Sequence, residues 1–178
     1  MSLMGILDRV ADVATFDKAI EPARKAVLAA PSAVKDLLHG TWLGHPLHPV
    51  LVQVPVGSWV SAGLLDAIPR MRPAATTLIG LGVAASVPAA ASGAADWSEQ
   101  GTGVRRLGAL HAVTNTVALG LYVGSLVARR QDRGVLGRVL SYTGLAVAGG
   151  SAPFTIVTTR PTRISPSSSS HGPSPLFP

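Results

Sequence analysis

The residues best suited to chemistry are two histidines in residues 44–49, which read Gly-His-Pro-Leu-His-Pro. Each histidine precedes a proline, and a residue in that position is pushed out of the α region toward an extended conformation. A polyproline helix has about three residues per turn, so His45 and His48 are predicted to present both imidazoles to one side. Neutral imidazole ligates metals and haem iron, which makes the pair a candidate ligand site.

More polar residues are expected near this pair. If the chain runs up and down through a membrane, the end of its second apolar stretch and the start of its third return to the surface where His48 lies. His111, just inside the third stretch, shares a helix face with Asn115 four residues later. Polar groups at that depth are costly, so they are either bonded to another helix or functional. The candidate ligands are His45, His48 and His111, supported by Asp96, Arg105, Arg106 and Asn115.

Two aspartates at predicted helix ends need cationic partners. Asp96 ends the second stretch, where a negative charge opposes the helix dipole. We expect Arg105, Arg106 or a histidine beside it. Asp66 lies at the opposite surface, and a local ion pair with Arg70 is expected there.

The elements that position these residues are four apolar stretches, residues 49–68, 74–95, 107–128 and 135–157. Each has close to the ~20 residues that cross a bilayer as a helix. Charged residues make up 13% of the chain, about half the usual share in soluble proteins, and the mean hydropathy is +0.38. The sequence predicts an all-α integral membrane four-helix bundle.

The two ends of the chain differ from this bundle. Apolar residues recur at helical spacing from Leu3 to Ala14, and a second helical stretch, residues 18–38, is expected to break at Pro22 and Pro31. We therefore predict an amphipathic helical segment over residues 1–40, lying on the membrane or under the bundle. The bundle takes residues 41–157, and the Ser/Pro-rich residues 158–178 are predicted to be a disordered tail.

Small residues are expected to let the helices approach closely, because helix association in lipid cannot rely on the hydrophobic effect. Such residues recur at helical spacing in three of the stretches: Gly80, Ala84 and Pro88; Gly120 and Gly124; Gly144 and Ala148. A bias toward Gly and Ala from a GC-rich genome explains part of this pattern. Both interpretations remain open.

Composition excludes several classes of function. The chain has no cysteine, which rules out disulfides, thiolate-bound zinc and iron–sulfur clusters ligated by this chain. Its arginines occur in short clusters between apolar stretches, a spacing that fits membrane-surface loops and not nucleic-acid binding. An enzyme acting alone is least expected, because no nucleophile–base pair, phosphate loop or acid pair is visible.

Three functional hypotheses remain for the histidines. The first is a hydrogen-bonded structural network that ties helix ends together. The second is a b-type haem or another metal held by histidines from facing helices. The third is a transport path, for example for protons.

The stretch Leu-His-Gly-Thr-Trp-Leu-Gly-His-Pro-Leu-His-Pro, residues 38–49, resembles the DUF2231 family of bacterial membrane proteins. The resemblance runs from about His39 to Ala148. It implies a multi-pass four-span bundle in the bacterial cell membrane, and some relatives are joined to a Rieske-type iron–sulfur domain. It therefore implies lipid, a Rieske-type or other redox partner, or a second copy of the chain as partners.

The chain departs from the family pattern near the end of the fourth stretch. Relatives tend to carry Gly-Gly-His there, whereas this chain has Gly149, Gly150 and Ser151. If that histidine is a ligand in the family, this chain lacks it.

Overall fold

The computed structural model describes residues 14–150, and all regular structure within that range is helical. This confirms the all-α class. The segment at residues 1–13 and the tail at residues 158–178 lie outside the described residues. In chain order the elements are α2 (Ala14–Leu28), α3 (Ser32–His39), the 3-10 helix η1 (Thr41–Leu43), α4 (His48–Leu51), α5 (Gln53–Asp66), α6 (Arg72–Ser98), α7 (Thr102–Arg130) and α8 (Gly134–Gly150).

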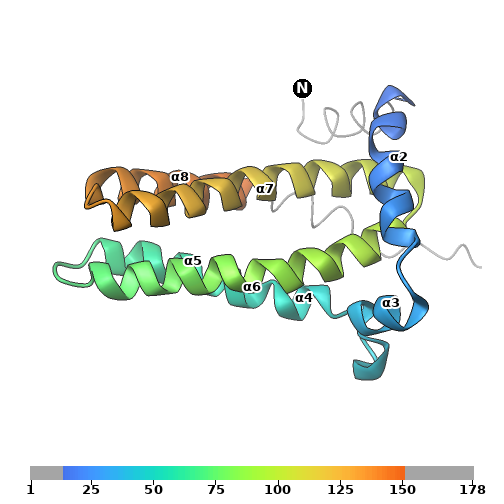
Figure 1. The fold of residues 1–178 in the computed structure, drawn as a ribbon, viewed down its shortest axis with the longest axis horizontal. Helices are drawn as coiled ribbons and strands as arrows, with labels where there is room; N and C mark the ends of the chain where they lie inside the picture. The colour runs from blue at the N-terminus through green and yellow to red at the C-terminus, as the bar shows by residue number, and fades with distance from the viewer. Residues whose placement is uncertain (1–13, 151–178) are drawn as a thin grey trace, which may run out of the picture.

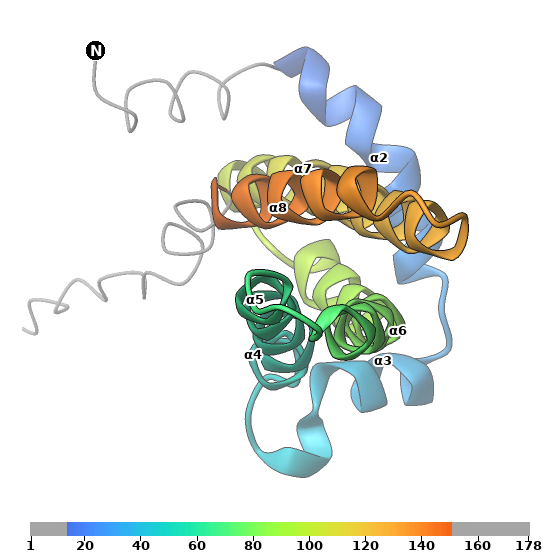
Figure 2. The same ribbon diagram turned by 90° about the vertical axis from the view of Figure 1, so that its left-hand side faces the viewer.

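The long helices form two antiparallel hairpins, α5 with α6 and α7 with α8, that lie as two layers (Figure 1). The view along the bundle shows α5 and α6 side by side, with α7 and α8 forming the other layer above them (Figure 2). At one end α2 crosses the bundle and packs on α6 and α7, while α3 and α4 pack on α6. The short N-terminal helices are thus gathered at a single end.

The first apolar stretch forms two helices that are nearly continuous. Val52, between α4 and α5, keeps helical angles of φ −66° and ψ −21°. Pro55 has no N–H to bond the carbonyl of Leu51 four residues earlier, which accounts for the interruption. Farther upstream, the predicted break at Pro31 is confirmed because α3 starts at Ser32, whereas Pro22 lies inside α2 and does not end it.

Two of the described helices, α6 with 27 residues and α7 with 29, are long and apolar enough to cross a membrane. They contain the predicted stretches 74–95 and 107–128. α8 starts one residue before the predicted 135, and the described residues end at Gly150.

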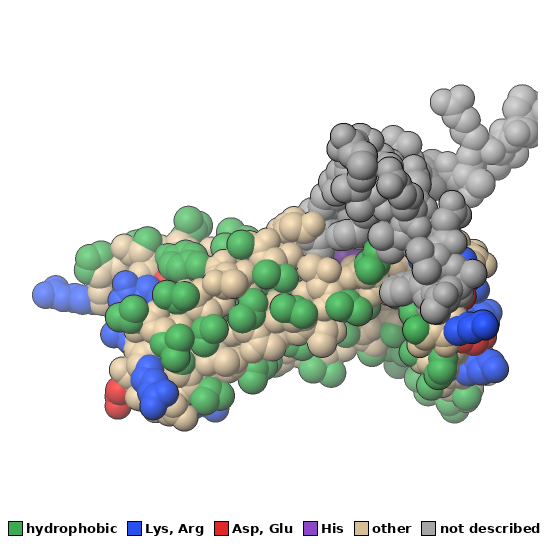
Figure 3. Space-filling model, turned by 90° about the horizontal axis from the view of Figure 1, so that it is seen from above, with side chains coloured by type: hydrophobic (Ala, Val, Ile, Leu, Met, Phe, Trp, Pro, Cys, Tyr) green, Lys and Arg blue, Asp and Glu red, His purple; other side chains and the backbone are tan. Residues whose placement is uncertain are grey.

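Apolar side chains face outward from these helices and small ones face inward. Large exposed side chains lie on all four long helices, for example Val60, Leu81, Val87, Val117 and Val139. Buried positions are held by small residues, for example Ala62, Ala75, Ala118, Ser92 and Ser125. On the face seen in Figure 3, apolar side chains are spread along the body and charged ones lie at its two ends. This arrangement is typical of helices packed in lipid, where interfaces are made by small residues.

An aromatic stack holds the two layers together. Trp59 of α5 and Tyr122 of α7 have ring centroids 4.2 Å apart and planes 12° from parallel. Gly82 of α6 lies under the indole, where a Cβ would be 2.6 Å from Trp59 Cδ1. The ring therefore occupies the space that a side chain at position 82 would fill.

The predicted close-packing glycines are only partly confirmed. A Cβ on Gly144 would lie 3.1 Å from Tyr122 Cε2, so that glycine is at a close contact. Gly80 and Gly120 have nothing within 4 Å of such a Cβ in the described chain, and the prediction for them is wrong. On α6 the glycine at a close contact is Gly82, two positions farther along.

Candidate functional site at the histidine end

The predicted site residues belong to elements that meet at one end of the bundle, which we call the histidine end (Figure 1). It is formed by α3, the start of α4, the end of α6 and the start of α7. Sequence reasoning placed the start of the first apolar stretch, the end of the second and the start of the third at a common end, but did not include α3. Their contacts differ from those expected.

His39, the last residue of α3, is the partner of Asp96. Its Nδ1 lies 2.8 Å from Asp96 Oδ1, and its Nε2 lies 3.3 Å from Glu99 Oε1. The hydrogen bond to Asp96 raises the pKa of His39, with burial acting in the opposite direction. A histidine was among the expected partners of Asp96. His39 itself was not singled out, although it stands in the motif that carries the family resemblance.

Gly40 allows the chain to turn directly after His39. It ends α3 in the left-handed region at φ 75°, where glycine carries no Cβ penalty. A Cβ there would lie 2.8 Å from the carbonyl oxygen of His45 and 2.9 Å from Leu47 Cβ. Position 40 therefore requires glycine for both its backbone conformation and its close packing.

His48, the first residue of α4, is bonded to the backbone of α6. Its Nδ1 lies 2.8 Å from the carbonyl oxygen of Ala89, which makes Nδ1 the donor. The ring rests on Gly93, where a Cβ would be 2.7 Å from His48 Cε1. In the same region Ser92 Oγ donates to the carbonyl of Leu38 at 2.6 Å.

These contacts define one face of α6, which we call the α6 strip: Ala89, Ser92, Gly93 and Asp96. The positions are three, four and seven apart, a spacing that places them on one side of a helix. The strip contacts the end of α3, at Leu38 and His39, and the start of α4, at His48. It is the main structural feature of the histidine end.

His45 does not share this environment. It is exposed, and its Nδ1 is 3.2 Å from the carbonyl oxygen of Pro46. His48 adopts helical structure at the start of α4 instead of the extended conformation predicted for it. The prediction that both imidazoles face one side assumed a continuous polyproline stretch. That assumption is wrong at His48.

His111 and Asn115 form the pair that their spacing predicts. Asn115 Nδ2 lies 2.8 Å from His111 Nε2, so the amide donates to that ring nitrogen. Both residues are half-buried on α7. The hydrogen bond occupies the nitrogen that a ligating histidine often offers to a metal.

The two arginines contact partners other than Asp96. Arg106 binds Asp17 of α2 through Nε to Oδ1 at 2.7 Å and Nη2 to Oδ2 at 2.5 Å. This contact lowers the pKa of Asp17 and holds α2 on α7. Arg105 Nη1 donates to the carbonyl of Gln100 at 3.1 Å, and its own carbonyl accepts from Trp97 Nε1 at 2.7 Å.

The histidine end is therefore a set of separate contacts and not one converging site. Within residues 14–150 there is no group of three or more His, Asp or Glu placed to hold a metal ion. The three candidate histidines do not fit a metal site of that kind. Of the three candidate histidines, His48 alone combines partial burial with a carbonyl of another helix that fixes its Nδ1, an arrangement that would suit a single histidine ligand.

A comparison with known protein families gives a match. The model of a family described as "Predicted membrane protein (DUF2231)" matches residues 44–159. This range starts at Gly44, one residue before the His-Pro-Leu-His-Pro segment, and covers α4 to α8. No curated protein and no solved structure matches the chain significantly.

Proposed function

The chain belongs to the DUF2231 family of predicted membrane proteins, and from this premise we propose that it crosses the bacterial cell membrane four times as a structural bundle. α6 and α7 supply two crossings. Residues 48–66, in α4 and α5, and the 17 residues of α8 pack beside them and supply the other two. The outward valines and leucines on all four long helices support a lipid-facing surface.

Cysteine labelling tests the four crossings. The chain contains no cysteine, so single variants report without background. Thr41→Cys and Gly101→Cys stand at the histidine end, and Asp132→Cys stands in the α7–α8 turn at the other end. We expect an impermeant thiol reagent to label the first two from the same side and the third from the opposite side. Labelling of Thr41→Cys and Gly101→Cys from opposite sides would contradict the four-span order.

In this proposal the histidines are structural. The observation that carries it is the α6 strip, on which His39, His48 and the carbonyl of Leu38 all make hydrogen bonds. These bonds fix the end of α3 and the start of α4, where the first crossing begins, against α6. Buried polar groups with partners hold helices together, whereas the same groups without partners are costly.

A second candidate function is a redox-associated membrane subunit that binds haem. One observation favours it: His48 donates from Nδ1 to Ala89, which leaves Nε2 as the basic nitrogen. A ligating histidine is commonly held in this way by its other nitrogen. A bound haem would supply one-electron chemistry, and His48 would hold its iron.

One experiment separates the two candidates. The purified protein is examined by absorbance spectroscopy and iron analysis, together with His48→Ala and, as a matched control, the exposed His45→Ala. The structural proposal predicts a colourless protein and a lower thermal stability for His48→Ala than for His45→Ala. A Soret band lost only in His48→Ala would establish the haem candidate and overturn the structural one.

A further inference from the structure

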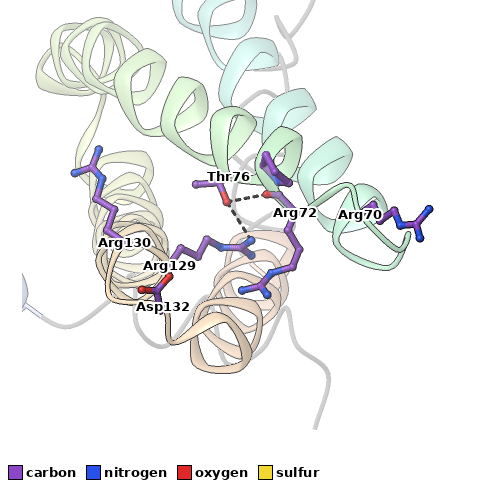
Figure 4. A pocket seen from close by; sticks show the side chains of 7 residues that line it. Arg70, Arg72, Thr76, Arg129, Arg130 and Asp132 are labelled. Carbon is purple, nitrogen blue, oxygen red and sulfur yellow. Dashed lines mark hydrogen bonds between the residues drawn. The ribbon is translucent and has the colours of Figure 1, made fainter.

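An arginine-lined depression lies at the end of the bundle opposite the histidines. It is open, has a volume of about 680 Å³, and lies between the α5–α6 turn and the end of α7. Four arginines line it, Arg70, Arg72, Arg129 and Arg130, together with Pro73, Thr76 and Asp132 (Figure 4). We call this feature the arginine depression.

Most of the positive charge in the depression has no carboxylate partner. Arg129 is neutralised by Asp66. Within residues 14–150, Arg70, Arg72 and Arg130 form no ion pair, and Asp132 forms none either. A concave surface that carries uncompensated cations concentrates anions.

The Arg72 side chain lies against the start of α8. Its guanidinium occupies the volume that a side chain at Gly134 would fill. Figure 4 shows Arg72 and Arg129 turned toward the middle of the site, with Arg70 and Arg130 at either side pointing outward. Arg72 is thus the inward-turned guanidinium without a carboxylate partner, and it lies beside Arg129, whose side chain is buried and paired with Asp66.

The start of α6 adds to the positive potential at this place. α6 begins at Arg72 with no side-chain cap and no acidic residue in its first turn. The free N–H groups of a first helical turn carry partial positive charge and favour anions. The helix start and the arginines therefore act on the same volume.

We propose that the arginine depression binds the phosphate group of an anionic phospholipid. One guanidinium group can donate two parallel hydrogen bonds to two oxygens of a phosphate, a geometry that a simple monovalent ion cannot match. The depression lies at the ends of helices with lipid-facing sides, which is the level of the headgroups. The site is far from the histidine end, and its test does not depend on how the histidines function.

The test uses the purified full-length protein in mixed micelles and native mass spectrometry. Phosphatidylglycerol is the probe, and phosphatidylcholine is the reference lipid. We expect the parent to retain phosphatidylglycerol preferentially and Arg72→Gln to weaken that binding about fivefold. Gly134→Ala should also weaken it, because the added methyl displaces the guanidinium without changing any charge. If Arg72→Gln does not fold, the exposed Arg70→Gln carries the same expectation.

Arg133→Gln is the matched control. Arg133 is exposed in the α7–α8 turn, at the same end of the bundle, but does not line the depression. Its replacement removes the same charge from the same surface and should change binding little. Equal losses in Arg133→Gln and Arg72→Gln would show diffuse attraction and overturn the site. Equal retention of the two lipids would also overturn it. Binding of inorganic phosphate without preference for phosphatidylglycerol would assign the site to the free anion and overturn the lipid proposal.

Discussion

Asp66 at the end of α5 and Arg129 near the end of α7 form a bidentate ion pair whose side chains are 0% and 3% exposed. Arg129 Nη1 donates to Asp66 Oδ1 at 2.9 Å, and Nη2 donates to Oδ2. Thr76 of α6 and Ser141 of α8 lie 3.4 and 3.3 Å from the same guanidinium group. One pair thus connects all four long helices, and the expected local pair of Asp66 with Arg70 is wrong.

Arg129→Gln should destabilise the protein strongly, by about 3–5 kcal/mol, because it leaves the buried Asp66 carboxylate without its countercharge. The measurement is the free energy of unfolding in detergent. Adding Asp66→Asn to Arg129→Gln should restore part of the loss, since the double variant buries no lone charge. Single and double variants of equal stability would show that the pair does not couple the helices.

Gly82 and Gly80 offer a matched pair on one helix. Gly82→Ala places a methyl group against the Trp59 indole and should cost about 1–3 kcal/mol through overpacking. Gly80→Ala meets open space and should leave the melting temperature unchanged or slightly higher. Thermal unfolding of both variants in the same detergent checks this. A larger loss of thermal stability for Gly80→Ala than for Gly82→Ala would mean that α6 is rotated about its axis so that Gly80, and not Gly82, faces the neighbouring helices.

Local spacing predicted those features that depend on nearby residues. Asn115 bonds His111 because residues four apart share a helix face. The break at Pro31 follows from the geometry of proline, and the apolar stretches 74–95 and 107–128 lie inside α6 and α7. These features require no knowledge of the tertiary structure.

The rotation of each helix and its distant partners could not be predicted. α6 is apolar on every side, so periodicity does not show which face is inward. Gly82 was therefore not distinguished from Gly80. Asp66 and Arg129 are separated by 63 positions, and only the docking of the two hairpins makes them neighbours.

Trp42 is predicted to lie at the membrane interface. Its side chain is 64% exposed, and Leu37 and Val34 of the neighbouring α3 are also exposed. Tryptophan favours the headgroup level, where its ring is half in an apolar medium. Brominated lipids should therefore quench a fluorescence component that Trp42→Phe removes. If the component lost in Trp42→Phe is quenched by aqueous iodide and not by brominated lipid, α3 faces water.

The contact between His39 and Asp96 should make stability depend on pH. The carboxylate holds the pKa of His39 above its ordinary value of 6.5, so the folded protein binds the proton more tightly than the unfolded chain. The stabilisation is therefore complete below about pH 6.5 and is lost as pH rises through the higher pKa of the folded state. Melting temperatures between about pH 5.5 and 8.5 should fall with rising pH in the parent and vary less in His39→Gln. His45→Gln, with an exposed ring outside this contact, is the control and should keep the parent's slope. A parent with a flat profile, or a His39→Gln variant with the parent's slope, would show that the ion pair does not contribute to folding.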